Sequence, residues 1–167
     1  MYFIRANSRD NFSGGETHRI ERFFTRVTGE MNDVALVLLK TRIEKHVSVT
    51  FLRPDAFVHS GTEVVTFGWG EADYNTWPRY LRMVTMNITD ASKCRKEYPG
   101  TNWICTGEKN LSNCVISPGS PTHINGWLMG IVSLGGNKSQ SRTPIANVNL
   151  RKYWKWIESY IKDQQYA

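Results

Sequence analysis

The chain has 167 residues, of which 40% are hydrophobic and 22% are charged, and its formal net charge at pH 7 is +6. This composition is that of an ordinary globular protein, and it excludes a disordered chain and a collagen-like repeat. No apolar run approaches the roughly 20 residues that a helix needs to cross a bilayer, so no transmembrane segment is expected. The length corresponds to a single domain.

Most of the chain is predicted to form short strands between turns rich in Gly, Pro, Asn and Ser. In chain order, the strands are expected at 2–6, 18–24, 34–39, 47–52, 63–67, 80–86, 103–106, 127–134 and 144–148. The continuous apolar run at 34–39 is typical of a strand buried on both faces, whereas 47–52 alternates as a half-buried strand does. This rhythm indicates an all-β barrel or sandwich.

The C-terminal segment changes to helical periodicity, which predicts an amphipathic helix over 149–163 that is capped by Asn149 or Asn147. Its apolar positions are Leu150, Tyr153, Trp154, Ile157, Tyr160 and Ile161. Its opposite face carries the basic residues Arg151, Lys152 and Lys155. We expect this basic face to be solvated, with a contact to an anionic polysaccharide or membrane surface as the alternative. No nucleic-acid-binding motif accompanies the charge, so no nucleic acid partner is expected.

The cysteines and the glycosylation sequons bear on the cellular compartment. The three cysteines are Cys94, Cys105 and Cys114, which are too few for a disulfide scaffold and poorly spaced for a zinc site. Asn-x-Ser/Thr sequons occur at Asn11, Asn87, Asn110 and Asn137. Together with a cysteine pair they favour a secreted glycoprotein, although residues 1–5 do not resemble a signal peptide. No metal or cofactor is expected.

A series of short motifs then follows in a specific order. They are Asn32-Asp33-Val34-Ala35-Leu36, Phe67-Gly68-Trp69-Gly70, Trp103-Ile104-Cys105-Thr106-Gly107, Cys114 with a Pro/Gly/Ser cluster after it, and Gly130-Ile131-Val132-Ser133-Leu134-Gly135. In this order and spacing the chain resembles the trypsin/chymotrypsin-like serine proteases over nearly its whole length. The resemblance implies two antiparallel six-stranded β-barrels with a C-terminal α-helix, and hydrolysis of peptide bonds between the barrels by a Ser, a His, an Asp and an oxyanion hole.

The resemblance also implies a division of the chain. Residues 1–167 would form a single peptidase domain that lacks its N-terminal strands. In it, 1–52 would be the remnant of barrel one, 53–148 barrel two and 149–163 the C-terminal helix. We expect a fragment or truncated chain whose first barrel is incomplete, unless another segment or chain supplies the missing strands.

The catalytic residues are matched only in part. Asp33 corresponds to the Asp of the triad. Only 32 residues precede it, and the one histidine among them, His18, corresponds to a strand position rather than to the catalytic loop. The other histidines, His46, His59 and His123, follow Asp33, which is contrary to the order in the family.

The nucleophile is also missing from its motif. The family pattern Gly-Asp-Ser-Gly-Gly-Pro corresponds here to Ile116-Ser117-Pro118-Gly119-Ser120-Pro121. Pro118 therefore occupies the nucleophile position, and Ile116 and Pro118 occupy the two oxyanion-hole positions. Because proline has no backbone N–H, one of the two oxyanion donors is lost together with the hydroxyl.

The remaining expectations also follow from the resemblance. Cys94 and Cys105 would form a disulfide and Cys114 would be a free thiol, while Val64 and Ile124 would replace a further family disulfide by apolar packing. The specificity pocket would have Ser112 at its floor and the segment Ser133, Leu134 and Gly135 as its wall. Its neutral floor would suit an apolar or aromatic side chain.

Three functions remain open. The first is a non-catalytic serine protease homologue (a pseudoenzyme) that is secreted and binds a protein or peptide in its degenerate cleft. The second is a chymotrypsin-like endopeptidase that uses an unorthodox nucleophile or upstream sequence. The third is a polyanion-binding surface protein that uses the basic face of the helix.

Overall fold

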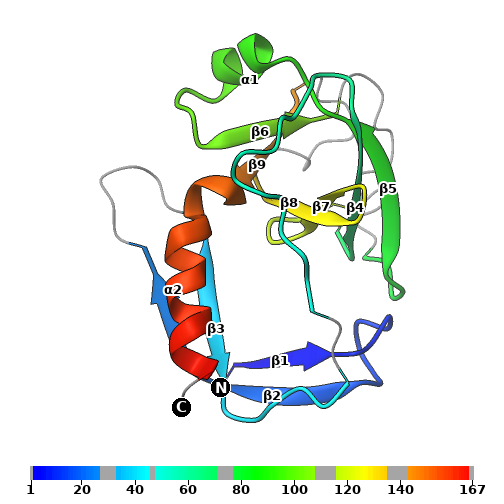
Figure 1. The fold of residues 1–167 in the computed structure, drawn as a ribbon. Coiled ribbons are helices and arrows are strands. Elements are labelled where there is room, and N and C mark those ends of the chain that lie inside the picture. The colour runs from blue at the N-terminus through cyan, green and yellow to red at the C-terminus, as the bar shows by residue number, and fades with distance from the viewer. Residues whose placement is uncertain are drawn as a thin grey trace.

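The computed structural model describes residues 2–26, 33–45, 48–70, 77–107, 116–134 and 143–165. Its strands form two antiparallel sheets, one of three strands in the order β1-β2-β3 and one of six strands in the order β5-β4-β7-β8-β9-β6 (Figure 1). The strands are β1 (Phe3–Ala6), β2 (Glu16–Thr25), β3 (Ala35–Leu39), β4 (Glu63–Gly68), β5 (Arg82–Asn87), β6 (Trp103–Thr106), β7 (Pro121–Ile124), β8 (Trp127–Leu134) and β9 (Ile145–Asn149). The helices are α1 (Ala91–Glu97), a 3₁₀ helix (Leu150–Tyr153) and α2 (Trp154–Gln165). None of these helices is long and apolar enough to cross a membrane.

The six-stranded sheet closes into a barrel. Ile88, which follows β5, forms an antiparallel bridge with Thr106 of β6. On either side of this bridge, the N–H of Thr89 donates to the carbonyl of Cys105 and the N–H of Gly107 donates to the carbonyl of Asn87, both at 2.9 Å. Because the two edge strands are hydrogen-bonded in this way, this sheet leaves little edge for a further strand.

An apolar core fills the barrel. Its buried members are Val64, Met86, Ile88, Ile104, Ile116, Ile124, Met129, Val132 and Ile145. Val64 and Ile124 both lie in this cluster, so the two positions where the resemblance implied a lost disulfide are indeed packed as apolar residues.

A buried polar network crosses the same barrel. Thr122 of β7 shares a hydrogen bond with the hydroxyl of Thr66 at 2.9 Å and donates to Oδ1 of Asn147 at 2.6 Å. The amide nitrogen of Asn147 donates to the carbonyl of Ile104 and to Oγ1 of Thr106, both at 3.0 Å. All four side chains of this network, Thr66, Thr106, Thr122 and Asn147, have no exposed surface. The network therefore joins four strands, and a polar group that lost its partner there would stay buried without a hydrogen bond.

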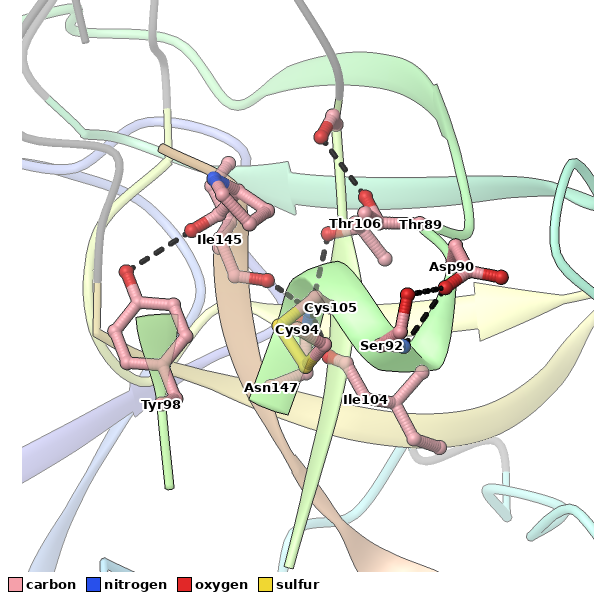
Figure 2. The surroundings of a disulfide bond; sticks show 12 residues. Thr89, Asp90, Ser92, Cys94, Tyr98, Ile104, Cys105, Thr106, Ile145 and Asn147 are labelled. Atoms are coloured by element: carbon pink, nitrogen blue, oxygen red, sulfur yellow. Dashed lines mark hydrogen bonds between the residues drawn. A yellow bond between two sulfur atoms is a disulfide. The ribbon is translucent and has the colours of Figure 1, made fainter. Parts of the chain in front are cut away.

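A disulfide joins Cys94 of α1 to Cys105 of β6, which confirms the pairing that the resemblance implied (Figure 2). Both cysteines are buried and pack with Ala146. The short helix α1 was not anticipated, although Asp90 carries a capping signal: its Oδ1 accepts the N–H of Ser92 at 2.8 Å.

The C-terminal helix packs between the two sheets. Leu150, Tyr153 and Ile157 form one cluster with Val148 of the barrel and with Val34, which precedes β3. The ring of Tyr160 lies 4.5 Å from that of Phe24 in β2, and Figure 1 shows α2 alongside β3. The helix therefore holds the small sheet against the barrel.

One of the two expected capping residues, Asn149, lies at the N-cap position of the C-terminal helical segment. Asn149 precedes the 3₁₀ helix, but its side chain makes no capping bond, and its Oδ1 instead accepts from Nε of Arg151 at 3.1 Å. Asn147 lies inside β9, in the buried network. The position of Asn149 was therefore predicted correctly but without a side-chain cap, whereas the prediction of Asn147 was wrong because its amide is bonded within the barrel core.

The three-stranded sheet is open on one face. Phe23 and Val37 are paired across β2 and β3, and they are 57% and 38% exposed. The prediction that 34–39 is buried on both faces was therefore wrong, because only the face with Val34 and Leu36 packs on the rest of the molecule. This open three-stranded sheet agrees with the expectation that the first barrel is incomplete.

One further strand prediction failed, and one strand was not predicted. In the described part of 47–52, the backbone forms only an isolated bridge between Phe51 and Leu128. Strand β7 was missed because it begins with Pro121 and has only four residues.

We predict that Asn147→Leu strongly destabilises the barrel. The leucine fills a similar volume but leaves the carbonyl of Ile104 and two buried hydroxyls without their partner. We expect the free energy of unfolding to fall by about 3 kcal/mol and the midpoint of thermal unfolding by roughly 6–12 °C, as measured by circular dichroism. As a control, Asn87→Leu removes an exposed amide with one hydrogen bond to Gly61, and it should cost less than about 1 kcal/mol. Equal losses in the two variants would contradict a structural role for the network.

Candidate functional site

A contact between the two sheets defines the candidate site. Ser133 of β8 is buried, and its hydroxyl donates to Oδ2 of Asp33, which lies just before β3. The two residues are 100 positions apart in the chain. The structure thus brings together two of the residues singled out from the sequence, one from each sheet.

The segment that carries Pro118 lies at the same end of β8. The N–H of Gly119 donates to the carbonyl of Val132 at 2.8 Å, and the N–H of Val132 donates to the carbonyl of Ser120 at 2.9 Å. Because Ser133 follows Val132, the Asp33 carboxylate contacts β8 one residue beyond the point where Pro118's turn is attached. Asp33, Ser133 and Pro118 therefore belong to one region of the molecule.

Residues 117–120 form a tight turn that their sequence favours. The N–H of Ser120 donates to the carbonyl of Ser117 at 3.0 Å, which places Pro118 and Gly119 at the two central positions. Gly119 has a φ of +93°, and proline followed by a positive-φ glycine is the signature of a type II turn. The ring of Pro118 is exposed at the tip of this turn.

The turn uses its own backbone donors. Besides the two N–H groups of Gly119 and Ser120, that of Ser117 donates to Oγ of Ser120 at 3.3 Å. Pro118 has no N–H at all. Within 117–120, no N–H remains to stabilise an oxyanion, and the buried hydroxyl of Ser120 is occupied as an acceptor.

Ile116 also differs from a residue that would line an oxyanion hole. Its side chain is only 2% exposed and belongs to the apolar core of the barrel. The position that the resemblance matches to a flexible glycine is therefore fixed by core packing.

The three histidines that the structure describes have partners away from Asp33. Nδ1 of the buried His18 lies 2.8 Å from the hydroxyl of Thr41, and its Nε2 lies 3.2 Å from a carboxylate oxygen of Glu16 without hydrogen-bond alignment. The other two pack against phenylalanines. The ring centroids of His59 and Phe57 are 4.5 Å apart, and those of His123 and Phe67 are 5.7 Å apart. None of the three hydrogen-bonds to Asp33, and His46 lies outside the described residues.

A hollow of about 400 Å³ adjoins the turn. Its lining combines the turn residues Ser117–Pro121 with Asn11, Phe67, Gly68, Trp69 and Trp77. Trp77 is 62% exposed, and the indole N–H of Trp69 donates to the carbonyl of Arg9 at 3.1 Å. Sequence reasoning used Phe67-Gly68-Trp69 only as a family motif and missed the aromatic hollow, because no local pattern places these residues beside Pro118.

An ion pair fixes one wall of this hollow. Nε of Arg79 lies 2.8 Å from Oδ2 of Asp10, and the N–H of Asn11 donates to the carbonyl of Arg79 at 2.8 Å. The pKa of Asp10 is lowered to about 2, first because the N–H of Phe12 donates to the carboxylate and next because Arg79 lies beside it. The segment that bears Asn11 is therefore anchored by a carboxylate that stays charged at ordinary pH.

The other predicted site residues lie in different places. Leu134 is 37% exposed at the end of β8, and the sequon asparagines Asn11 and Asn87 are exposed. Outside the described residues lie Ser112, Cys114, Gly135, Asn110 and Asn137. Among the residues that the structure does describe, no group of His, Cys, Asp and Glu is placed to hold a metal ion.

Comparison with known proteins decides the family. The family model for trypsin matches residues 3–157. The chain belongs to the trypsin family. The residues of this trypsin-family chain that contact one another at the site, Asp33 and Ser133, both lie within the matched range.

Several trypsins resemble the chain in sequence. It is 31% identical to Trypsin-3 of Salmo salar over 137 residues, which cover 77% of this chain and 57% of that protein. It is 33% identical to Serine protease 1 of Homo sapiens over 142 residues, which cover 78% of this chain and 56% of that protein. The chain thus spans a little over half the length of these relatives.

Solved structures share the fold. The scabies mite inactivated protease paralogue S-I1 matches with a TM-score of 0.79 at 18% identity, covering 96% of this chain and 76% of that one. Neuropsin, a serine protease expressed in the limbic system of mouse brain, matches with a TM-score of 0.75 at 20% identity, covering 87% and 72%. At these identities the likeness establishes the trypsin-like fold.

We predict that His123 makes the fold sensitive to mild acid. Burial lowers the pKa of His123 below its ordinary value of 6.5, and its Nδ1 has no hydrogen-bond partner. The imidazole of His123 therefore binds a proton more readily in the unfolded chain than in the folded one. As a result, the free energy of unfolding is unaffected by His123 above about pH 6.5 and decreases as the pH falls below that value. Urea unfolding should give a lower free energy of unfolding at pH 5.5 than at pH 7.5.

The His123→Phe variant should show a smaller difference between the two pH values, because phenylalanine has no proton to bind. The matched control is His59→Phe, which removes an exposed histidine and should keep the full difference. A difference that is unchanged in His123→Phe would refute the assignment.

Proposed function

We propose that the chain is a non-catalytic serine protease homologue that binds a protein or peptide beside the position where the family has its nucleophile. The observation that carries this proposal is the turn at Pro118. It offers no hydroxyl at its tip, and its own hydrogen bonds use the N–H groups of Ser117, Gly119 and Ser120.

The energetic argument rests on more than the missing hydroxyl. Loss of a single oxyanion donor costs about 2.7–4 kcal/mol of transition-state stabilisation, and the proline removes one such donor outright. The core packing of Ile116 constrains the second position. The described histidines add no base, since none of them hydrogen-bonds to Asp33. To become catalytic, the described site would thus have to gain three things at once: a nucleophile, a base and an oxyanion hole.

The aromatic hollow supports the binding role. Exposed tryptophans are frequent anchors in protein interfaces because one indole buries a large apolar area and can also donate a hydrogen bond. Trp77 and Pro118 present such a surface, since both line the hollow beside the turn. We infer that the ligand contributes an apolar or aromatic side chain to this hollow.

Secretion is the compartment that fits this proposal. The disulfide between Cys94 and Cys105 is of a kind that persists in oxidising surroundings. The chain also shares its fold with a protein described as an inactivated protease paralogue, so this fold occurs without protease activity.

A second candidate function is a chymotrypsin-like endopeptidase that attacks through another serine. The contact between Asp33 and Ser133 and the sequence likeness to trypsins favour it. Against it, the hydroxyl of Ser120 is buried and accepts the N–H of Ser117. Ser117 is the remaining hydroxyl of the turn.

We predict that fluorophosphonate probes do not label the chain. We also predict that Pro118→Ser turns over no peptide substrate, because restoring the hydroxyl restores neither a base nor the second oxyanion position. The measurement is labelling and peptide turnover by the chain, with active trypsin as the positive control. Covalent modification of Ser117 or Ser120, or measurable turnover by Pro118→Ser, would favour the endopeptidase instead.

We predict that peptides selected for binding to the chain from a random phage library depend on Trp77. Replacement of Trp77 by alanine should lower the affinity of the chain for the selected peptides at least tenfold, because the exposed indole lines the hollow. Trp127→Ala is the matched control, since Trp127 is also exposed, at 40%, but lies at the other end of β8. Peptides that bind both variants equally well would argue against this hollow as the binding site.

A further inference from the structure

A second hollow, of about 370 Å³, opens at the start of α2, away from the turn at Pro118. Four basic side chains and two indoles contribute to its lining: Arg26, Arg151, Lys152, Lys155, Trp154 and Trp156. The basic residues come from two separate parts of the chain, the segment after β2 and the segment that enters the helix. We call this hollow the basic pocket.

Two cations of the basic pocket are held in place by neutral groups. The guanidinium of Arg151 donates to the carbonyl of Ala56 and to Oδ1 of Asn149. Nζ of Lys152 donates to the hydroxyl of Thr101 at 2.6 Å. These bonds restrict the side chains but leave their charges uncompensated, so little conformational entropy remains to be lost when an anion binds.

The other two cations are also available to an anion. The guanidinium carbon of Arg26 lies 5.5 Å from the centroid of the Tyr153 ring, and one of its N–H groups donates to the carbonyl of Lys152 at 3.5 Å. Lys155 is exposed on the first turn of α2. Among the residues that the structure describes, no carboxylate forms an ion pair with any of the four cations.

Two acidic residues that are close to the basic pocket in the sequence, and whose side chains the structure describes, have other partners. Glu158 pairs with Lys162 at 3.1 Å, and Asp55 pairs with Arg53 at 2.9 Å. The basic pocket thus concentrates four positive charges at the start of α2.

We propose that the basic pocket binds a sulfated polysaccharide. Several cations from separate segments suit a ligand that carries several anionic groups rather than a single ion. Trp154 and Trp156 add apolar surface on which the C–H face of a sugar ring can pack. The disulfide between Cys94 and Cys105 indicates an oxidising compartment, where sulfated polysaccharides are more abundant polyanions than nucleic acids.

The surroundings allow a ligand longer than one sugar unit. Arg151 also lines a neighbouring hollow of about 210 Å³, which is shared with Arg95 of α1 and with Thr101. The basic surface therefore continues from α2 past Arg151 towards α1. This site does not depend on the proposal for the turn at Pro118, because the two hollows share no residue.

The test measures the affinity of the full chain for a heparin octasaccharide at several salt concentrations. The variant Arg26→Gln/Lys155→Gln removes two pocket charges that make few structural contacts. The matched control is Arg19→Gln/Arg82→Gln, which lowers the net charge equally at two exposed residues outside the basic pocket. Arg151 is left intact because its bonds to Ala56 and Asn149 also support the fold.

We expect binding of the octasaccharide to weaken steeply with salt. The pocket variant should lose at least tenfold in affinity, with a shallower slope of log affinity against log salt by about one to two units, whereas the control should change by less than about threefold. Equal losses in the two variants, or no binding by the chain, would overturn the proposal. Two further probes test the ligand class: equal binding of an unsulfated hyaluronate octasaccharide, or tighter binding of a single-stranded oligonucleotide of equal charge, would also overturn it.

Discussion

The position of the candidate site depends on the buried hydrogen bonds of Asn147. Its amide connects β9 to Thr122 of β7 and to Ile104 and Thr106 of β6. Strand β8 lies between β7 and β9, so the network fixes the two strands on either side of it. Ser133 and the attachment point of Pro118's turn both lie on β8, and the position of the site therefore depends on a buried network in which each polar group needs its partner.

The same strand explains why the site departs from catalysis in more than one respect. Val132 binds the turn from one side through two backbone hydrogen bonds, and the turn satisfies its remaining donors internally. Proline and a positive-φ glycine stabilise this arrangement, because each fits a central position of a type II turn. The local structure at Pro118 is thus a stable alternative to an oxyanion hole and not a site that lacks only one atom.

Much of the fold could be predicted from the sequence, because the signals involved are local or belong to a motif. The strands at 103–106 and 127–134 match the structure, and the pairing of Cys94 with Cys105 followed from the family resemblance. The failures arise where tertiary contacts decide. Val37 is exposed because the small sheet packs on one face alone, and Asn147, a plausible helix cap in the sequence, is taken by the barrel core. For the site, Asp33 and Ser133 were recognised separately, but only the fold could show their contact or place Trp69 and Trp77 beside Pro118.

The disulfide links the redox state of the surroundings to the surface of α2. Cys94 and Cys105 close a loop that contains Thr101 and Asn102. The first accepts the hydrogen bond of Lys152, and the carbonyl of the second accepts the N–H of Asn149 at 2.8 Å. Reduction of the disulfide would remove the covalent link between α1 and β6, and with it one constraint on the loop that supports Lys152. The charge pattern at the start of α2 is therefore best defined in an oxidising compartment.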